Sequence, residues 1–399
     1  MICRICKGTD LEKFLDLGHH PPSDAFLTEE QLREPETHYP LDVWVCKTCG
    51  LVQLGYVVPK EVLFNHEYPY TTGSNTEGIE HFRNFAFHVA RWWKLTKNDL
   101  VVDIGSNDGT LLQGFKNLGC RVLGVEPCYK IGLKAVVNGI NTFPGFFNEF
   151  IGGGLAYDHG KAKIITATNV FAHVDDLHEF MKAVDILLAP DGIFIIEAPH
   201  LSELIKNLAY DTIYHEHLSY LHHYPIDYLA SKFGMELFDA EAYPVHGGTV
   251  RYYLRRGTHG TPHMNDPYIP ALHQFAQQVV NHKHSLYHKL SLIRQSGYSI
   301  VGVSAPAKGN TLLNYCNIGP DILDYLTEVS EHKIGKYSPG MHIPVVPDDR
   351  LIEDQPHYAL ILAWNWKEAI MTSLRKKGYR GKFIIPLPEP YVYDTSKTL

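Results

Sequence analysis

The segment LVVDIGSNDGTLLQGF, at Leu100–Phe115, constrains the fold of this 399-residue chain more than any other stretch. An apolar run of strand length leads into a glycine-containing turn and then into spacing typical of an amphipathic helix. A second strand, RVLGVEP, ends in an acid at Glu126, and the stretches AKIITATNVFAHV and DGIFIIEAP lie on either side of a helix expected at about 176–188. Strands that alternate with helices predict an α/β domain with a mostly parallel sheet.

The glycine-containing turn, Gly105–Gly109, favours one kind of ligand over another. Its glycines let the backbone approach a ligand closely, and Glu126 at the tip of the next strand can accept both hydroxyls of a ribose. The glycine spacing is GxxxG and not GxGxxG, and the acidic Asp103 precedes it, so a pyrophosphate is disfavoured. A cationic nucleoside without phosphates fits better, and S-adenosylmethionine is such a ligand.

Two patterns follow this domain. GMELFDAEAYPVHGGTVRYYLRR predicts two strands that pair around a glycine-containing turn, which completes a domain over residues 76–265. A polar helix, at about 273–295, then leads to YSIVGVSAPAKGNTLLNY, which again has the order strand, turn, helix. With the later apolar runs YALILAW and GKFIIPLPEP, this pattern predicts a second Rossmann-like α/β domain over residues 266–399.

The turn of this second domain differs from the first in its chemistry. Lys308 and Asn310 offer a cation and an amide at a helix N-terminus, a setting suited to a phosphate. Glu328, near the end of the next strand, is placed to reach a second ribose. The alternative interpretation is a degenerate Rossmann-like domain that serves only for packing.

Two CxxC pairs lie near the N-terminus, with the second followed by a glycine in CKTCG. Each pair can supply two thiolates from one tight turn, and four thiolates complete the tetrahedral shell of zinc without an open position. We therefore expect a structural zinc ion in a small domain over residues 1–75; four buried free cysteines are the alternative. The predicted ligands are Cys3, Cys6, Cys46 and Cys49.

Composition excludes several classes of protein. The net charge is −8 and the basic residues are scattered, which argues against a surface for nucleic acid or anionic membrane. The longest apolar runs are too short to span a bilayer. An odd count of seven cysteines, behind an N-terminus with no signal-peptide pattern, favours a cytoplasmic protein. A monomer is the default expectation.

Several motifs resemble one family. VVDIGSNDGTLL, GVEP and TATNVFAHVDDL are similar to strand motifs of class I S-adenosylmethionine-dependent methyltransferases, and the whole chain resembles the sugar-nucleotide C-methyltransferases. CRIC, CKTC, IYHEHLSYL, HGGTVRYY and APAKGNTLLNY carry that wider resemblance. It departs at Ser304, where relatives often have glycine, and at Glu328, where aspartate is usual. Both departures bear on which nucleotide is bound.

The resemblance implies an activity and a set of cofactor contacts. These enzymes methylate C-3, or in some cases C-5, of a nucleotide-linked 4-keto-6-deoxyhexose in deoxysugar biosynthesis, and their C-terminal domain helps to hold the sugar nucleotide. The expected S-adenosylmethionine contacts are Gly105, Ser106 and Asn107 with the methionine portion, Glu126 with the ribose, Asn169 closing the pocket, and Asp103 beside the loop.

The segment DTIYHEHLSYLHHYP, at Asp211–Pro225, is the candidate site of proton transfer. A carbon beside a ketone must lose a proton before it can accept a methyl group, and histidine is the side chain that titrates nearest neutrality. His215 and His217 alternate with Glu216, and the opposed side chains of an extended segment would not converge on one ion, so a metal site is disfavoured. Packing of the aromatic side chains remains an alternative.

The resemblance then assigns roles within and around this segment. It implies that His217 is the general base, that Glu216 bonds the sugar or orients the base, and that Tyr214 is a second candidate base or a stabiliser of the enolate. His173 is expected near the keto oxygen. Tyr68, or else Tyr70, is expected to close the site over the substrate.

Two other classes of function stay open at this stage. An O- or N-methyltransferase needs a base but forms no enolate, so it would not exchange the C-3 proton of a keto sugar with solvent. A non-catalytic sugar-nucleotide or adaptor module would bind S-adenosylmethionine without turnover and would use the zinc domain as a docking surface.

Overall fold

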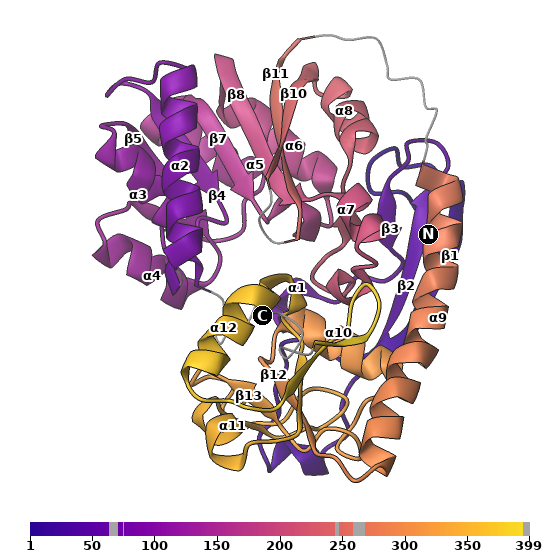
Figure 1. Cartoon of the computed structure of the whole chain (residues 1–399). Helices are drawn as coiled ribbons and strands as arrows, with labels where there is room; N and C mark the ends of the chain where they lie inside the picture. Colours follow the sequence, from indigo (N-terminus) through magenta and orange to yellow (C-terminus); the bar gives the residue numbers. More distant parts are fainter. Residues whose placement is uncertain (64–70, 75, 244–246, 258–267, 394–399) are drawn as a thin grey trace.

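The computed structural model describes residues 1–63, 71–74, 76–243, 247–257 and 268–393, which form three sheets. Figure 1 shows the largest sheet in the upper half of the molecule, the C-terminal sheet below it, and the N-terminal strands along one side. The predicted α/β class is confirmed, with a mostly parallel sheet in the middle of the chain and a second Rossmann-like sheet after it. Within the described residues, no helix is both long and apolar enough to cross a bilayer.

The central sheet has seven strands in the order β10-β11-β8-β7-β4-β5-β6. β11 runs antiparallel to β10, as the sequence predicts, and also to β8, and the other pairs are parallel. The strands are β4 (Leu100–Ile104), β5 (Arg121–Glu126), β6 (Thr142–Pro144), β7 (Ala162–Thr168), β8 (Leu188–Pro199), β10 (Met235–Tyr243) and β11 (Thr249–Arg256).

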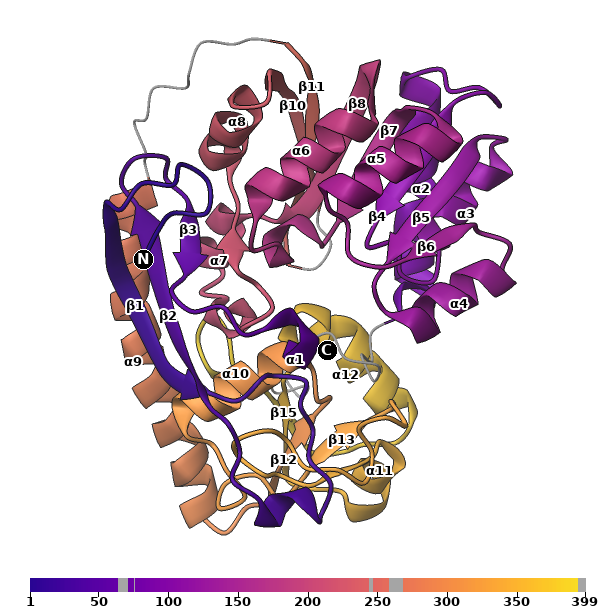
Figure 2. The same ribbon diagram turned by 180° about the vertical axis from the view of Figure 1, so that it is seen from behind.

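Helices cover both faces of this sheet because successive strand residues point to opposite sides. Val101 packs with Phe85 and Phe115 on one face, whereas Val102 packs with Phe180 on the other. The two views show α2 in front of one face and α5 and α6 in front of the other (Figures 1 and 2). The helices are α2 (Thr76–Trp92), α3 (Thr110–Asn117), α4 (Tyr129–Val137), α5 (Glu149–His159) and α6 (Leu177–Leu187).

The C-terminal sheet has six strands in the order β14-β13-β12-β15-β16-β17, all parallel except for β17. Its strands are β12 (Ile300–Val303), β13 (Leu326–Glu328), β14 (Val345–Pro347), β15 (Tyr358–Ile361), β16 (Lys382–Ile385) and β17 (Tyr391–Tyr393). Its helices are α10 (Ala307–Cys316), α11 (Asp349–Asp354) and α12 (Lys367–Lys376), and the 3-10 turn η5 (Trp364–Trp366) follows β15.

The N-terminal sheet is antiparallel and takes one strand from elsewhere in the chain. β1 (Leu11–His20), β2 (Tyr39–Cys46) and β3 (Val52–Leu54) pair in order, and the short β9 (Ser219–Tyr220) pairs with β3. The long helix α9 (Tyr268–Gln295) lies along β1 in both views (Figures 1 and 2). The N-terminal sheet, α9 and the C-terminal sheet share one hydrophobic core.

Short elements connect the three sheets around the site. The segment between β8 and β10 carries both β9 and the predicted proton-transfer motif. The short elements are η1 (Gln31–Arg33), α1 (Lys60–Leu63), η2 (Thr72–Ser74), η3 (Phe171–His173), α7 (Leu201–Lys206), η4 (Tyr210–Thr212) and α8 (His223–Ser231).

Candidate active site

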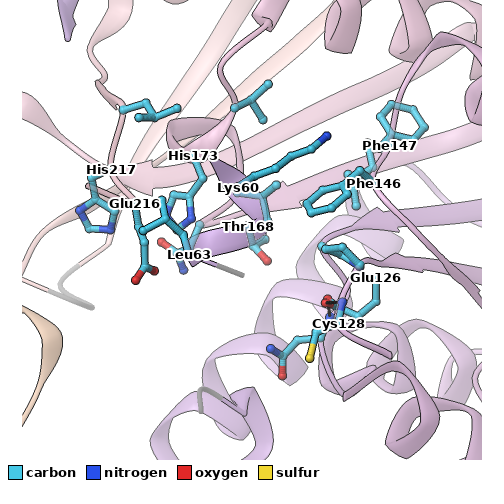
Figure 3. A pocket seen from close by; sticks show the side chains of 18 of the residues that line it. Lys60, Leu63, Glu126, Cys128, Phe146, Phe147, Thr168, His173, Glu216 and His217 are labelled. Carbon is cyan, nitrogen blue, oxygen red and sulfur yellow. Dashed lines mark hydrogen bonds between the residues drawn. The ribbon is translucent and has the colours of Figure 1, made fainter. Parts of the chain in front are cut away.

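A cavity of about 760 Å³ lies at the carboxyl ends of β4, β5, β7 and β8. Ligands of open α/β sheets bind at this edge. Its lining continues into the segment that holds Tyr214–His217 and ends on Lys308 and Asn365 of the C-terminal domain. Figure 3 shows Glu126 and Phe147 at one end of the site, and His173 and His217 at the other.

The turn after β4 requires glycine at Gly105. Its φ is +67°, and a Cβ there would lie 2.3 Å from Cγ2 of Val170. The backbone N–H groups of Gly105 and Ser106 both donate to the Val125 carbonyl, at 2.8 and 3.1 Å, which folds the turn over the end of β5. The backbone can therefore approach a ligand without an intervening side chain.

The carboxylate of Glu126 clasps this turn from the end of β5. One oxygen accepts the Asn107 N–H at 2.8 Å and the other accepts the Cys128 N–H at 2.8 Å. Burial raises the pKa of Glu126, and these two N–H donors oppose the rise. Each carboxylate oxygen can accept more than one hydrogen bond, so the clasp leaves capacity for the hydroxyls of a ribose.

Asp103 has a different environment, because it lies inside the sheet. Its carboxylate accepts the Thr166 hydroxyl at 2.6 Å, which links β4 to β7. Burial raises the pKa of Asp103 to about 7, and the nearby Glu126 contributes to the rise. A carboxyl group in this state is partly protonated at neutral pH, so Asp103 is suited to a hydrogen bond more than to a full negative charge.

The residues around the loop fit S-adenosylmethionine. Ser106 lines the cavity, and its buried Oγ has no hydrogen-bond partner among the described residues. Phe146 and Phe147 stand beside the Glu126 end of the cavity and offer aromatic faces to an adenine (Figure 3). All six predicted cofactor contacts line the cavity; they are Asp103, Gly105, Ser106, Asn107, Glu126 and Asn169.

At the other end of the cavity, two histidines meet. η3 brings His173 to within 5.0 Å of His217, measured between ring centroids, and the Tyr214 ring lies 4.1 Å from that of His217. His217 Nδ1 lies 2.7 Å from the Thr212 carbonyl, which can only accept, so Nδ1 carries the proton. The neutral ring therefore keeps its lone pair on Nε2.

Burial sets the protonation states of these side chains. It lowers the pKa of His217 to about 4 and, with the neighbouring His217, lowers the pKa of His173 to about 3. Burial also raises the pKa of the Tyr214 hydroxyl well above its ordinary value. At neutral pH both imidazoles are thus uncharged and the phenol keeps its proton. Glu216 is buried beside them and lines the same cavity (Figure 3).

The predicted substrate contacts of the C-terminal domain divide into two groups. Lys308 lines the cavity, and its ammonium donates to Asn365 Oδ1 at 2.5 Å and lies 3.8 Å from Asp211 Oδ2. Asn310 lies outside the lining, because its amide donates to the Ser23 carbonyl at 2.7 Å. Glu328 also lies outside it, and its carboxylate accepts backbone N–H groups from Ala305, Val329 and Ser330. Contact of Asn310 and Glu328 with a substrate stays a prediction.

Two predicted residues, Tyr68 and Tyr70, lie outside the described residues. The expectation that one of them closes the site over the substrate therefore stays a prediction.

The four predicted zinc ligands come together. Their sulfur atoms all lie within 4.8 Å of one another, with Cys3 3.5 Å from Cys49 and Cys6 3.4 Å from Cys46. Gly50, after the second pair, has φ +72° and its N–H donates to the Cys46 carbonyl at 2.9 Å. Four thiolates at this spacing are the donor set of a closed, structural zinc site.

Sequence reasoning missed three residues around the cavity. Asp211 is fully buried and accepts the Trp364 indole N–H at 2.7 Å, so it joins the segment between β8 and β10 to the C-terminal domain. Lys60, from α1, lies 4.2 Å from the centre of the Phe146 ring. Arg4 lies inside the first CxxC pair and reaches the active-site segments. The residues that these side chains contact are far apart from them in the sequence, so no local sequence pattern identifies the contacts.

Comparisons with known proteins cover the whole chain. Family models match a zinc-binding domain over residues 3–64, a methyltransferase domain over residues 78–239 and a C-methyltransferase C-terminal domain over residues 244–388. The C-methyltransferase NovU of Streptomyces niveus is 32% identical over 413 residues, which span 100% of this chain and 98% of that protein.

Solved structures match the central part at low identity. The CcbJ methyltransferase from Streptomyces caelestis is 16% identical and covers 48% of this chain and 94% of its own, with a TM-score of 0.36. An S-adenosylmethionine-dependent methyltransferase from Clostridium acetobutylicum is 14% identical and covers 45% of this chain and 92% of its own, also with a TM-score of 0.36.

The identity along the full length, together with the three family models in order, decides the assignment. The predicted cofactor contacts line one cavity, and the four predicted zinc ligands form one cluster. This chain belongs to the family of S-adenosylmethionine-dependent C-methyltransferases with an N-terminal zinc-binding domain.

Proposed function

We propose that this enzyme methylates C-3 of a nucleotide-linked 4-keto-6-deoxyhexose in deoxysugar biosynthesis, with His217 as the base that removes the C-3 proton. The observation that carries the proposal is the 2.7 Å hydrogen bond between His217 Nδ1 and the Thr212 carbonyl, in a residue that lines the same cavity as the predicted cofactor contacts. This bond leaves the Nε2 lone pair free to take a proton. S-adenosylmethionine supplies the methyl group as a sulfonium.

The protonation states favour His217 over Tyr214 as the base. A neutral imidazole can take a proton at once, whereas a phenol whose pKa is raised by burial cannot. Tyr214 is better suited to donate its hydroxyl hydrogen to the oxygen of the enolate. The pKa of about 4 makes free His217 a weak base, so the imidazolium that forms needs a partner, and the carboxyl group of Glu216 lies nearby (Figure 3).

His173 is proposed to act beside the keto oxygen. Its pKa of about 3 keeps it neutral, so a ring N–H can donate to the oxygen on which negative charge develops. A neutral donor also does not compete with His217 for the proton. This division assigns proton removal to one histidine and charge stabilisation to the other.

The extent of the cavity supports a substrate with a nucleotide attached. Ligand pockets are typically about 300–1,000 Å³, and 760 Å³ lies in the upper part of that range. The cofactor contacts occupy one end, and beyond His217 the lining reaches Lys308 and Asn365. Lys308 places a cation where the diphosphate of a sugar nucleotide would lie, with the base of the nucleotide toward the C-terminal domain.

The test is solvent exchange coupled to methyl transfer. The enzyme is incubated in D2O with S-adenosylhomocysteine and a panel of nucleotide 4-keto-6-deoxyhexoses, and deuterium is located by NMR. We expect exchange at C-3 in this incubation. When S-adenosylmethionine replaces S-adenosylhomocysteine, we expect the sugar nucleotide to gain the mass of one methyl group. Exchange and methylation at C-5 would redirect the proposal to that carbon. Methylation without any C–H exchange would contradict the role of an enolate.

A further inference from the structure

The side chain of Arg4 connects the zinc cluster to the active site. Arg4 lies between the predicted ligands Cys3 and Cys6, yet its side chain is only 7% exposed and bonds residues outside the cluster. Long cationic side chains are rarely buried unless they are paired. Its partners are therefore informative about its role.

Those partners belong to the two segments that carry the histidines. Nη1 of Arg4 donates to the Leu218 carbonyl at 3.3 Å, and Leu218 directly follows His217. Nε donates to Asp175 Oδ1 at 3.2 Å, and Asp175 stands two residues after His173. One guanidinium thus bonds both segments.

A third bond anchors the same guanidinium to the N-terminal sheet. Nη1 also donates to the Leu54 carbonyl at 2.9 Å, at the end of β3. The backbone N–H of Arg4 donates to Gln53 Oε1 at 2.9 Å, and Gln53 pairs with Ser219 across β3 and β9. Arg4 therefore connects the first CxxC pair, the end of β3 and the segment between β8 and β10.

We propose that Arg4 is a positioning residue: the zinc cluster fixes Arg4, and Arg4 fixes the distance between His173 and His217. This rests on the roles proposed above for the two histidines. The zinc site would then serve catalysis by holding the proton acceptor and the enolate partner in register, although the metal never meets the substrate. Misplacement of a catalytic group by about 1 Å can cost roughly 100-fold in rate.

The test compares Arg4→Met with the wild type in the full-length, zinc-loaded enzyme. Methionine keeps most of the length and apolar volume of the side chain but removes all three side-chain bonds. We expect one zinc per chain, an unchanged KM for S-adenosylmethionine, and a fall in kcat and in C–H exchange of about 10- to 100-fold. A side chain that only stabilised the fold would lower the melting temperature and leave kcat intact.

Two further variants keep the test decisive if Arg4→Met folds poorly. Arg4→Lys keeps the charge but cannot reach both segments, and Asp175→Asn removes the ion pair to the His173 segment alone. Lys7→Gln is the matched control, since Lys7 directly follows the first CxxC pair and its side chain forms an exposed 3.8 Å pair with Asp176. We expect intermediate losses of kcat for the first two and less than a twofold change for the control.

The inference fails if folded, zinc-loaded Arg4 variants retain kcat within twofold of the wild type. It also fails if Lys7→Gln loses as much activity as Arg4→Met, since a general weakening of the knuckle would then explain both. A wild-type enzyme that neither exchanges nor methylates any keto sugar nucleotide would instead contradict the proposed function.

Discussion

The two Rossmann-like sheets of this enzyme carry the same clasp at their carboxyl ends. In the methyltransferase sheet, Glu126 at the end of β5 accepts the Asn107 N–H from the turn after β4 at 2.8 Å. In the C-terminal sheet, Glu328 at the end of β13 accepts the Ala305 N–H from the turn after β12 at 3.0 Å. Gly105 and Ser304, at the start of the two turns, have φ of +67° and +66°.

The two clasps differ in what lies above them. The first turn lines the cavity from its start at Gly105. A loop of the N-terminal domain lies over the start of the second turn, and the lining includes only the residues that follow, 306–308. Lys333 donates both to the Ala305 carbonyl and to Asp24 at 2.9 Å, and Asn310 donates to the Ser23 carbonyl. A shared backbone geometry therefore does not fix a shared use, because side chains from a distant part of the chain decide whether the edge is open.

The largest expected effect is on kcat, and it compares a histidine of the active site with a buried histidine of α9. His217→Asn should lower kcat by about 10²–10⁴, the usual cost of losing a general base, with little change in cofactor affinity. His282→Asn is the matched variant, because both ring nitrogens of His282 are bonded, to the Tyr210 hydroxyl and the Pro386 carbonyl. It should lower the melting temperature and spare kcat. Near-full turnover and C-3 exchange in His217→Asn would transfer the role of base to Tyr214.

The two clasping carboxylates give the next comparison. Glu126→Ala should weaken S-adenosylmethionine binding by about 1.5–3 kcal/mol, the range for hydrogen bonds to a charged group. Glu328→Ala removes a similar clasp from the covered sheet and should leave the cofactor affinity unchanged. Calorimetric titration of both variants measures the difference. Equal losses of affinity would mean that the second sheet contributes to the cofactor site after all.

The fold was predictable where the pattern is local. The main strands of the two Rossmann-like sheets, the antiparallel pair β10–β11 and the four cysteines follow from periodicity and spacing over short stretches. β9 was not predicted, since a strand of two residues has no period, and its pairing with β3 joins residues such as Gln53 and Ser219 that are far apart in the chain.

The site was predictable to the same extent and for the same reason. The residues around Gly105 and the pair His173 and His217 lie in motifs that can be recognised as such, and the structure brings them to one cavity. Asn310 resembles a phosphate contact in sequence, but Ser23 takes its amide. Local sequence gives no information on a partner almost three hundred residues away, so neither this contact nor that of Arg4 could be foreseen.

Low pH should destabilise the N-terminal sheet and the methyltransferase domain more than the C-terminal sheet. Burial lowers the pKa of six histidines to about 3 or 4, all on the N-terminal sheet, in the methyltransferase domain or in its insertion. They are His20, His173, His200, His215, His217 and His222. Their ordinary pKa is about 6.5, so the unfolded chain binds more protons below that pH.

Stability should therefore be complete above pH 6.5 and fall as the pH drops from 6.5 toward 4. Melting temperatures measured between pH 7.5 and pH 5 should decrease by several degrees. Hydrogen exchange at pH 5 should show the segment around His215 and His217 opening before β12 and β15. A flat profile, or earlier opening of the C-terminal sheet, would contradict the placement of these buried imidazoles.

The smallest expected effect concerns the two left-handed positions. A non-glycine residue at φ near +60° costs about 1–2 kcal/mol, and glycine gives back roughly 0.5–1 kcal/mol through the entropy of the unfolded chain. Ser304→Gly should thus stabilise the enzyme by no more than about 1 kcal/mol in denaturant unfolding and leave the kinetics unchanged. Gly105→Ala should have the opposite sign and also weaken the cofactor, because its new Cβ meets Val170 at 2.3 Å. If Ser304→Gly instead changed the KM of the sugar nucleotide, the Ser304 side chain would contact the substrate, and the substrate site would extend from Lys308 to the start of this turn.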